Sequence, residues 1–224
     1  MRPFAAALLD VDGTLVDSNE AHVEVWHTAF AERGLTISRN LIRKQIGKGA
    51  DMLVPTLAPQ LNEQEQKAVG ERQGTLFKSH YLELINAFPG AHQLIELLAR
   101  RGIKVVLASS SGESEIEHYI ELLDVRDMIY AVTSRDEVAH TKPAPDIFSQ
   151  ALKKVAPLDS LDVIAVGDTP YDAIAATRCG IYAVGLRTGG FSDTELNRAG
   201  AQIIYDSVAE LHAVLNTSPV FPPR

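Results

Sequence analysis

The sequence has little cysteine and a minority of basic residues. Cys179 is the only cysteine among 224 residues, so no disulfide can form within the chain. This composition suits a reducing compartment, and we expect a cytoplasmic protein. The 21 basic and 29 acidic residues give a formal net charge of −8. Sequence-independent nucleic-acid binding requires basic surface, so we expect no nucleic-acid partner. An anionic substrate would need local positive charge.

Long hydrophobic runs are also missing. The run 4–9 is too short to cross a membrane, and Asp10 and Asp12 follow it directly, so we expect no membrane partner. It also lacks a secretory cleavage pattern. No fixed-period repeat is visible, which argues against a solenoid. The hydrophobic content of 46% instead suffices for one sizeable core with a smaller attached module.

Short apolar runs alternate with helical patterns through most of the chain. The runs cover 4–9, 103–108, 129–133, 163–166 and 181–184, and the helical patterns cover 91–101, 113–123, 146–155, 171–178 and 207–215. Continuous apolar strands of this length are typical of a parallel sheet covered on both faces. Their alternation with helices predicts a doubly wound α/β fold.

Residues 17–87 interrupt this alternation, because only helical signals occur there. The expected helices cover 20–33 with Ser18 or Asn19 as N-cap, 39–46 capped by Ser38, 50–57 and 62–87. We interpret 17–87 as a helical cap inserted into a core formed by 1–16 and 88–216. The two short crossings would form a hinge. The segment 217–224 holds three prolines and is expected to be a loosely ordered, flexible tail.

The first chemical signal is the segment Asp10-Val11-Asp12-Gly13-Thr14, at the end of an apolar run. Residues i and i+2 of an extended chain point to the same side, so both carboxylates can face one ligand. One can attack phosphorus to give an aspartyl phosphate, while the other serves as general acid and then as general base. Two like charges this close also favour a bound cation. We therefore predict Asp10 as the nucleophile and Asp12 as the acid/base.

A second group of polar residues supplies groups that can hold phosphate. Ser109 ends the run 103–108, and its hydroxyl, with Ser110 beside it, can contact a phosphate oxygen. Lys142 lies in a loop stiffened by two prolines. Its ammonium can pair with Asp10 and neutralise the phosphoryl group.

A further acidic pair follows the run 163–166. Asp168 is well placed to bind Mg²⁺, which prefers oxygen ligands. Asp172 lies one helical turn further on and can hold a metal-bound water or orient Lys142. Each of these motifs alone also has an ordinary explanation as a turn, a helix N-cap or a solvated lysine. Together they form a complete set for phosphoryl transfer, and they are expected to meet beyond the carboxyl ends of the strands.

The ordered segments 10–18, 107–111, 142–146 and 167–172 resemble the haloacid dehalogenase (HAD) superfamily over nearly the whole chain. The resemblance implies a Rossmann-like core and Mg²⁺ dependence. It implies that Asp10 is the nucleophile, that Asp12 is the acid/base, and that Asp10, Asp12 (through its carbonyl) and Asp168 bind the metal. Ser109 and Lys142 match phosphate-contacting positions. A helical insertion after the first motif resembles the cap of the phosphoglycolate phosphatase and β-phosphoglucomutase branch.

Three cap residues are candidates for substrate contact. The segment 46–51 is similar to the substrate loop of phosphoglycolate-phosphatase-like proteins, and Lys48 within it could meet a substrate carboxylate or phosphate. Arg43 is a second candidate. His22 lies just past the hinge and could reach the acid/base or the substrate. The alternatives are a flexible turn between helices for the loop and a partly buried helix residue for His22.

These patterns predict a phosphatase that hydrolyses a small phosphorylated metabolite, phosphoglycolate-like or sugar-phosphate-like. A β-phosphoglucomutase-like mutase would use the same site, although Gly167-Asp168-Thr169 is closer to the phosphatase form. The dehalogenase branch lacks the second aspartate, so Asp12 argues against that reaction. A non-catalytic binding module on the same fold would be expected to lose a motif carboxylate, and none is lost. The physiological substrate and the oligomeric state do not follow from the sequence.

Overall fold

A sheet of six parallel strands forms the centre of the protein, which a computed structural model describes over residues 4–217. The strands are β1 (Ala6–Leu9), β2 (Lys104–Ala108), β3 (Ile129–Thr133), β4 (Val163–Gly167), β5 (Tyr182–Leu186) and β6 (Ala201–Tyr205). Their order across the sheet is β3-β2-β1-β4-β5-β6, with parallel pairing throughout. This confirms the predicted doubly wound, Rossmann-like α/β fold.

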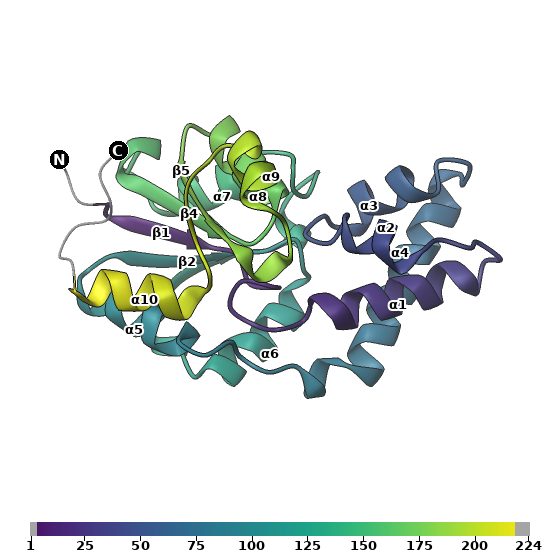
Figure 1. Cartoon of the computed structure of the whole chain (residues 1–224), viewed down its shortest axis with the longest axis horizontal. Coiled ribbons are helices and arrows are strands. Elements are labelled where there is room, and N and C mark those ends of the chain that lie inside the picture. Colours follow the sequence, from purple (N-terminus) through teal and green to yellow (C-terminus); the bar gives the residue numbers. More distant parts are fainter. Residues whose placement is uncertain (1–3, 218–224) are drawn as a thin grey trace.

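Helices cover both faces of the sheet (Figure 1). One face carries α5 (Ala91–Arg100), α6 (Glu113–Leu123) and α10 (Val208–Thr217), and the other carries α7 (Asp146–Lys154), α8 (Pro170–Arg178) and α9 (Asp193–Ala199). Two separate apolar clusters result, one containing Leu94 and Leu211 and the other containing Leu8 and Phe148. Within residues 4–217, no helix combines the length and the apolar character needed to cross a membrane.

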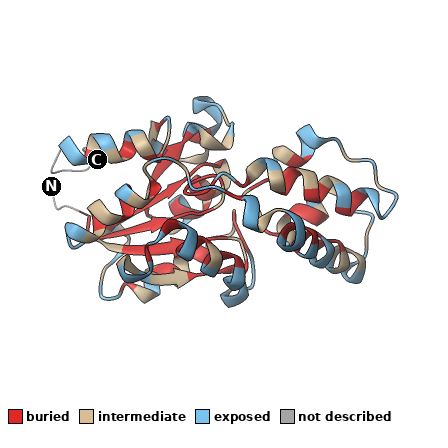
Figure 2. Ribbon diagram, turned by 90° about the horizontal axis from the view of Figure 1, so that it is seen from below, coloured by how far each residue is buried: buried red, intermediate tan, exposed pale blue. Residues whose placement is uncertain are grey.

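A helical segment follows β1 and lies beyond the carboxyl ends of the strands (Figure 1). It contains α1 (Asn19–Ala31), α2 (Arg39–Arg43), α3 (Ala50–Leu57), α4 (Glu63–His80) and a 3-10 turn over Leu82–Leu84. Its helices bury a set of residues between them (Figure 2), and these residues, such as Phe30 and Phe77, belong to the same apolar cluster as Leu94. The two stretches that connect this helical segment to the rest of the chain run side by side. Asp17 N donates to Asn86 O (2.9 Å), and Phe88 N donates to Leu15 O (2.9 Å).

Several expected boundaries were wrong. The helix expected over 62–87 ends at His80, and Val16 and Ala87 form an isolated antiparallel bridge. The segments Asp193–Ala199 and Ala201–Tyr205, a helix and an edge strand, were not predicted. The expected tail begins one residue too early, since Thr217 ends α10, and the rest of it lies outside the described residues.

Leu8 provides a test of the packing that holds β1 in place. Its side chain is fully buried, so Leu8→Ala should lower the free energy of unfolding by about 2–5 kcal/mol, through lost burial and the cavity left behind. Leu84→Ala is the matched control, because Leu84 is 69% exposed and the same change there should cost less than about 0.5 kcal/mol. Urea denaturation measures both, and similar losses would contradict the proposed packing of β1.

Candidate active site

Asp10 and Asp12 follow β1, the strand between β2 and β4. The backbone N–H of Asp10 donates to Val166 O (2.9 Å), which continues the sheet pairing by one residue. The chain then turns at Gly13, whose φ of +75° favours glycine. A Cβ on Gly13 would lie 2.2 Å from both Asn19 Nδ2 and Asp168 Oδ2. Glycine therefore allows the turn to approach Asp168 closely. Asp10 and Asp12 both line a small cavity at this end of the sheet.

Lys142 is buried between two carboxylates. Its Nζ lies 2.5 Å from Asp10 Oδ1 and 2.7 Å from Asp172 Oδ1, and its side chain has no solvent exposure. Burial alone would lower the pKa of Lys142, but Asp10 and Asp172 together raise it above its usual range. Asp172 Oδ2 in turn accepts hydrogen bonds from the hydroxyl of Thr169 (2.6 Å) and its N–H (3.1 Å). The first turn of α8 thus fixes the lysine beside Asp10.

Asp168 lies on the other side of Asp10. The hydroxyl of Thr14 is 3.0 Å from Asp10 Oδ2 and 3.0 Å from Asp168 Oδ1, so it bridges the two carboxylates. Asn19 Nδ2 donates to Asp168 Oδ2 (2.9 Å). Burial, followed by repulsion from Asp10 and Asp172, raises the pKa of Asp168 well above its usual value. Burial also raises the pKa of Asp10, and the attraction of Lys142 only partly opposes this.

This arrangement has an excess of buried negative charge that suits a cation. One carboxylate oxygen from each of Asp10, Asp168 and Asp172 lies within 4.8 Å of the others. Asp172 uses both of its oxygens, one for Lys142 and the other for two hydrogen bonds from Thr169. Asp10 pairs with Lys142 through Oδ1 only, so its Oδ2 and the carboxylate of Asp168 are the groups better placed for a metal ion. Beside them, the buried Oδ1 of Asn19 has no hydrogen-bond partner among the described residues. Hard oxygen donors of this kind fit Mg²⁺.

Asp12 is held by hydrogen-bond donors on both of its oxygens. Its Oδ1 is contacted by Ser18 Oγ (2.7 Å), His22 Nε2 (3.1 Å) and Tyr119 Oη (3.2 Å), and its Oδ2 by Ser111 Oγ (2.6 Å) and, at 3.5 Å, Ser109 Oγ. Burial alone would raise the pKa of Asp12, but the hydrogen bonds lower it well below its usual range. Ser18 was expected to cap α1 with its side chain. It stands at the N-cap position, yet its hydroxyl binds Asp12 instead.

His22 is positioned by residues of the helical segment. Its ring stacks on Phe77 with centroids 4.0 Å apart, and its Nδ1 lies 3.3 Å from the amide nitrogen of Gln73. Burial would lower the pKa of His22, but the hydrogen bond to Asp12 raises it. The structure therefore brings His22 to the acid/base candidate.

The loop between α2 and α3 closes the cavity from the side of the helical segment. Gly47 O accepts a hydrogen bond from Ser110 Oγ (3.2 Å), and Gly49 N donates to Thr141 Oγ1 (2.9 Å). Lys48 lines the cavity, with its Nζ 2.6 Å from Gln45 Oε1, and burial lowers its pKa. The enclosed cavity has a volume of only about 50 Å³.

Arg43 is not brought to this cavity. Its guanidinium forms two hydrogen bonds of 2.7 Å with the carboxylate of Glu20 on the surface of the helical segment. Arg43 is absent from the cavity wall, so the sequence expectation of a substrate contact there has no structural support. The reason is physical: a bidentate pair with a nearby carboxylate directs the side chain along the surface.

Several wall residues were missed in the sequence. Glu115 and Tyr119 lie one helical turn apart on α6 and face the site. Their spacing of four residues is a signal that could have found them. Gln73 and Arg135 also line the cavity and have no comparable sequence signal.

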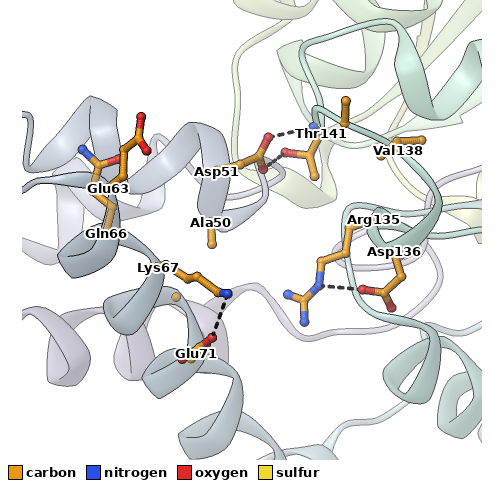
Figure 3. Close-up of a pocket in the computed structure, with 12 residues that line it drawn as sticks. Ala50, Asp51, Glu63, Gln66, Lys67, Glu71, Arg135, Asp136, Val138 and Thr141 are labelled. Atoms are coloured by element: carbon orange, nitrogen blue, oxygen red, sulfur yellow. Dashed lines mark hydrogen bonds and ion pairs between the residues drawn. The ribbon is translucent and has the colours of Figure 1, made fainter.

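A second, larger cavity of about 470 Å³ lies between the helical segment and the loop after β3 (Figure 3). It shares Ala50 and Arg135 with the wall of the small cavity. Lys67 and Arg135 extend into it from opposite sides in Figure 3. Asp51 closes one end through hydrogen bonds from Thr141 N (2.9 Å) and Thr141 Oγ1 (2.5 Å).

A doubly wound sheet with paired acidic loops at its carboxyl edge is the architecture of a HAD-like hydrolase. A model of the haloacid dehalogenase-like hydrolase family matches residues 7–186, and the chain belongs to that family. The chain named probable phosphatase IndB from Dickeya dadantii is 28% identical, over 98% of this chain and 99% of its own. The phosphoglycolate phosphatase of Rhodospirillum rubrum is 28% identical, over 92% of this chain and 88% of its own. A solved hydrolase from Pseudomonas syringae has a TM-score of 0.89 and 29% identity, over 96% and 98%.

The family match confirms the resemblance that the four motifs carry. Because relatives that span most of the chain are named as phosphatases, the prediction of a HAD-type phosphoric monoester hydrolase is also confirmed.

The buried ion pairs of Lys142 predict a large effect on stability. Lys142→Met keeps an apolar stem of similar length but leaves Asp10 and Asp172 without their cation. Breaking a buried pair in this way should lower the free energy of unfolding by about 3–5 kcal/mol. Lys153→Met is the matched control, because Lys153 is exposed on α7 and should change it by less than about 0.5 kcal/mol. Denaturation near neutral pH without divalent metal measures both, and equal losses would refute the structural role of Lys142.

Proposed function

We propose that the protein is a Mg²⁺-dependent phosphatase that hydrolyses small phosphate esters through a phosphorylated Asp10. The observation that carries this proposal is the position of Asp10 on the cavity wall, paired with buried Lys142 and with Asp12 beside it. Relatives named as phosphatases, one of them for phosphoglycolate, support a small phosphorylated substrate.

The reaction proceeds in two steps. An Asp10 carboxylate oxygen attacks phosphorus, the bond from phosphorus to the ester oxygen breaks, and Asp12 gives a proton to the departing alcohol. A water then attacks the aspartyl phosphate and loses a proton to Asp12, and cleavage of the acyl phosphate frees inorganic phosphate and Asp10. Lys142 offsets the negative charge that Asp10 and the phosphoryl group bring together. Ser109 and Ser110 supply hydroxyls to the phosphate oxygens.

Asp10 and Asp168 are the proposed metal-binding carboxylates, with the Asp12 carbonyl as the third protein ligand implied by the family. When bound, Mg²⁺ supplies charge neutralisation and orientation to the phosphoryl oxygens. Asp172 acts on the metal site indirectly, since it holds Lys142. The unpartnered Oδ1 of Asn19 supports a polar ligand or ordered water at the same place.

Residues 17–87 act as a cap on the core formed by 1–16 and 88–216. The paired backbone crossings at Asp17 and Phe88 are the proposed hinge. The contacts of Gly47 and Gly49 with the core support a closed state that excludes bulk water from Asp10. In that state Lys48 and His22 face the substrate and Asp12 respectively. Opening of the cap would admit substrate and release phosphate.

Replacement of the nucleophile tests the phosphatase function. Asp10→Asn keeps the size of the side chain but removes the attacking carboxylate, so turnover of p-nitrophenyl phosphate with Mg²⁺ should fall by about three orders of magnitude or more. Asp127→Asn, the same change at an exposed position outside the hinge and the cavity walls, should leave turnover within about twofold. Phosphate release measures both. Substantial activity of Asp10→Asn with an intact fold would exclude Asp10 as the nucleophile.

Metal binding has a readout that does not depend on activity. Mg²⁺ at about 100 times its Kd should stabilise the wild-type chain by about 2.7 kcal/mol. For a chain of this size, that raises Tm by about 5–10 °C. Asp168→Asn should lose this Mg²⁺-dependent shift, whereas Asp127→Asn, at an exposed position, should keep it. Thermal melts with Mg²⁺ and with a chelator measure the shift. Equal shifts in wild type and Asp168→Asn would argue against metal binding by Asp168.

A further inference from the structure

Glu115 is a buried carboxylate on the wall of the small cavity. It lies in the first turn of α6 and is 3% exposed. Among residues 4–217, no hydrogen bond or ion pair to its carboxylate is formed. The N-terminal turn of a helix favours negative charge, which offsets part of the cost of burial. It does not supply hydrogen bonds to the carboxylate oxygens, which are not fully enclosed by protein atoms and stay open to a ligand.

The neighbouring carboxylate of Asp12 is in the opposite situation. Donors from Ser18, His22, Tyr119 and Ser111 contact its two oxygens. Both oxygens of Asp12 therefore have protein donors, whereas the carboxylate of Glu115 keeps its hydrogen-bonding capacity for a ligand. The side-chain amide of Gln73 adds to this capacity. Its nitrogen lies against His22 Nδ1, and its oxygen has no protein partner in the described part of the chain.

The charges around Glu115 decide which ligand group suits it. Burial raises the pKa of Glu115, and the nearby charges of His22 and Arg135 only partly offset this. A substrate carboxylate placed against Glu115 would be repelled by Glu115 and by Asp12, and the attraction of Lys48 and Arg135 on the same wall would oppose this repulsion. A substrate ammonium would meet the positive charges of His22 and Arg135. A neutral hydroxyl donates to a carboxylate without either conflict.

We propose that Glu115 selects phosphate esters whose alcohol carries further hydroxyl groups, as in polyol and sugar phosphates, over esters whose alcohol carries a carboxylate. The proposal rests on the phosphatase function above and assigns its substrate class. It distinguishes the chain from its relative in Rhodospirillum rubrum, which is named for phosphoglycolate, the ester of an alcohol with a carboxylate.

The larger cavity gives room for such an alcohol. The small cavity of about 50 Å³ holds little beyond the phosphoryl group and the first carbons. A longer polyol would pass Ala50 and Arg135, which both cavities share, into the space of about 470 Å³ (Figure 3). Lys67 and Glu71 face that space as a donor and an acceptor for further hydroxyls, and their mutual distance of 3.8 Å leaves both accessible.

Three esters with the same two-carbon skeleton test the proposal: 2-hydroxyethyl phosphate, 2-aminoethyl phosphate and 2-phosphoglycolate. We expect the wild-type holoenzyme to favour the hydroxyl ester over phosphoglycolate by about tenfold or more in kcat/KM, the effect of one hydrogen bond to a charged acceptor. Glu115→Gln retains a hydrogen-bond acceptor but removes the negative charge. The preference for the hydroxyl ester over phosphoglycolate should therefore fall by about tenfold, mainly because kcat/KM for phosphoglycolate rises. Glu115→Leu should lose affinity for the hydroxyl ester by about tenfold.

Affinity measurements separate this proposal from the phosphatase function. Each ester is titrated by calorimetry into the Asp10→Asn chain at saturating Mg²⁺, with and without Glu115→Gln. The amide keeps an oxygen donor for the metal, and no turnover is expected. The matched control is Glu113→Gln, which removes an exposed carboxylate from the same helical turn and should leave the ratios of the three affinities unchanged. A wild-type preference for phosphoglycolate would overturn the proposal. Affinity ratios that Glu115→Gln leaves unchanged would also overturn it. A preference for the aminoethyl ester that Glu115→Gln abolishes would overturn it as well. If the affinity ratios are as expected but the wild-type chain does not turn the esters over, that result would count against the phosphatase function alone.

Discussion

The buried ammonium of Lys142 is the interaction on which the rest of the site depends. It lies between Asp10 and Asp172, and together with Asp168 these carboxylates place three acidic groups within a few ångströms. In a chain with a net charge of −8, such a cluster is tolerable only with compensating positive charge inside the protein. Lys142 supplies one such charge, and a divalent cation at the proposed metal site would supply the other. The adjacent ends of β1 and β4 make the cluster possible.

Much of this arrangement follows from where the apolar runs end. The runs that became β1, β2 and β4 are followed by Asp10, Ser109 and Asp168, and parallel neighbours bring such ends together. The edge strand β6 was missed for the opposite reason. Its sequence, Ala-Gln-Ile-Ile-Tyr, is short and contains an exposed glutamine, so it resembles a loop until pairing with β5 is known.

Contacts between distant residues explain what the sequence could not predict. Thr14 is 154 positions from Asp168, and Tyr119 is 107 from Asp12, so no local pattern specifies either hydrogen bond. Arg43 illustrates the converse. A basic residue near a substrate loop is a reasonable candidate from composition, yet its orientation depends on Glu20, which lies on another helix. Residue type identified the catalytic candidates, whereas side-chain direction required the packed structure.

The helix α6 combines two tasks that are physically separable. Tyr119 on this helix, with Ser111 before it, donates hydrogen bonds to the Asp12 carboxylate, which would keep that group oriented for the proposed proton transfer whatever the alcohol. Glu115, on the same face and one turn away, is left unsatisfied toward the cavity. A change at Glu115 therefore alters which alcohol is bound without disturbing the donors that hold Asp12. Because α6 packs against the sheet, the proposed role of Glu115 would place part of the leaving-group selection outside the loop between α2 and α3.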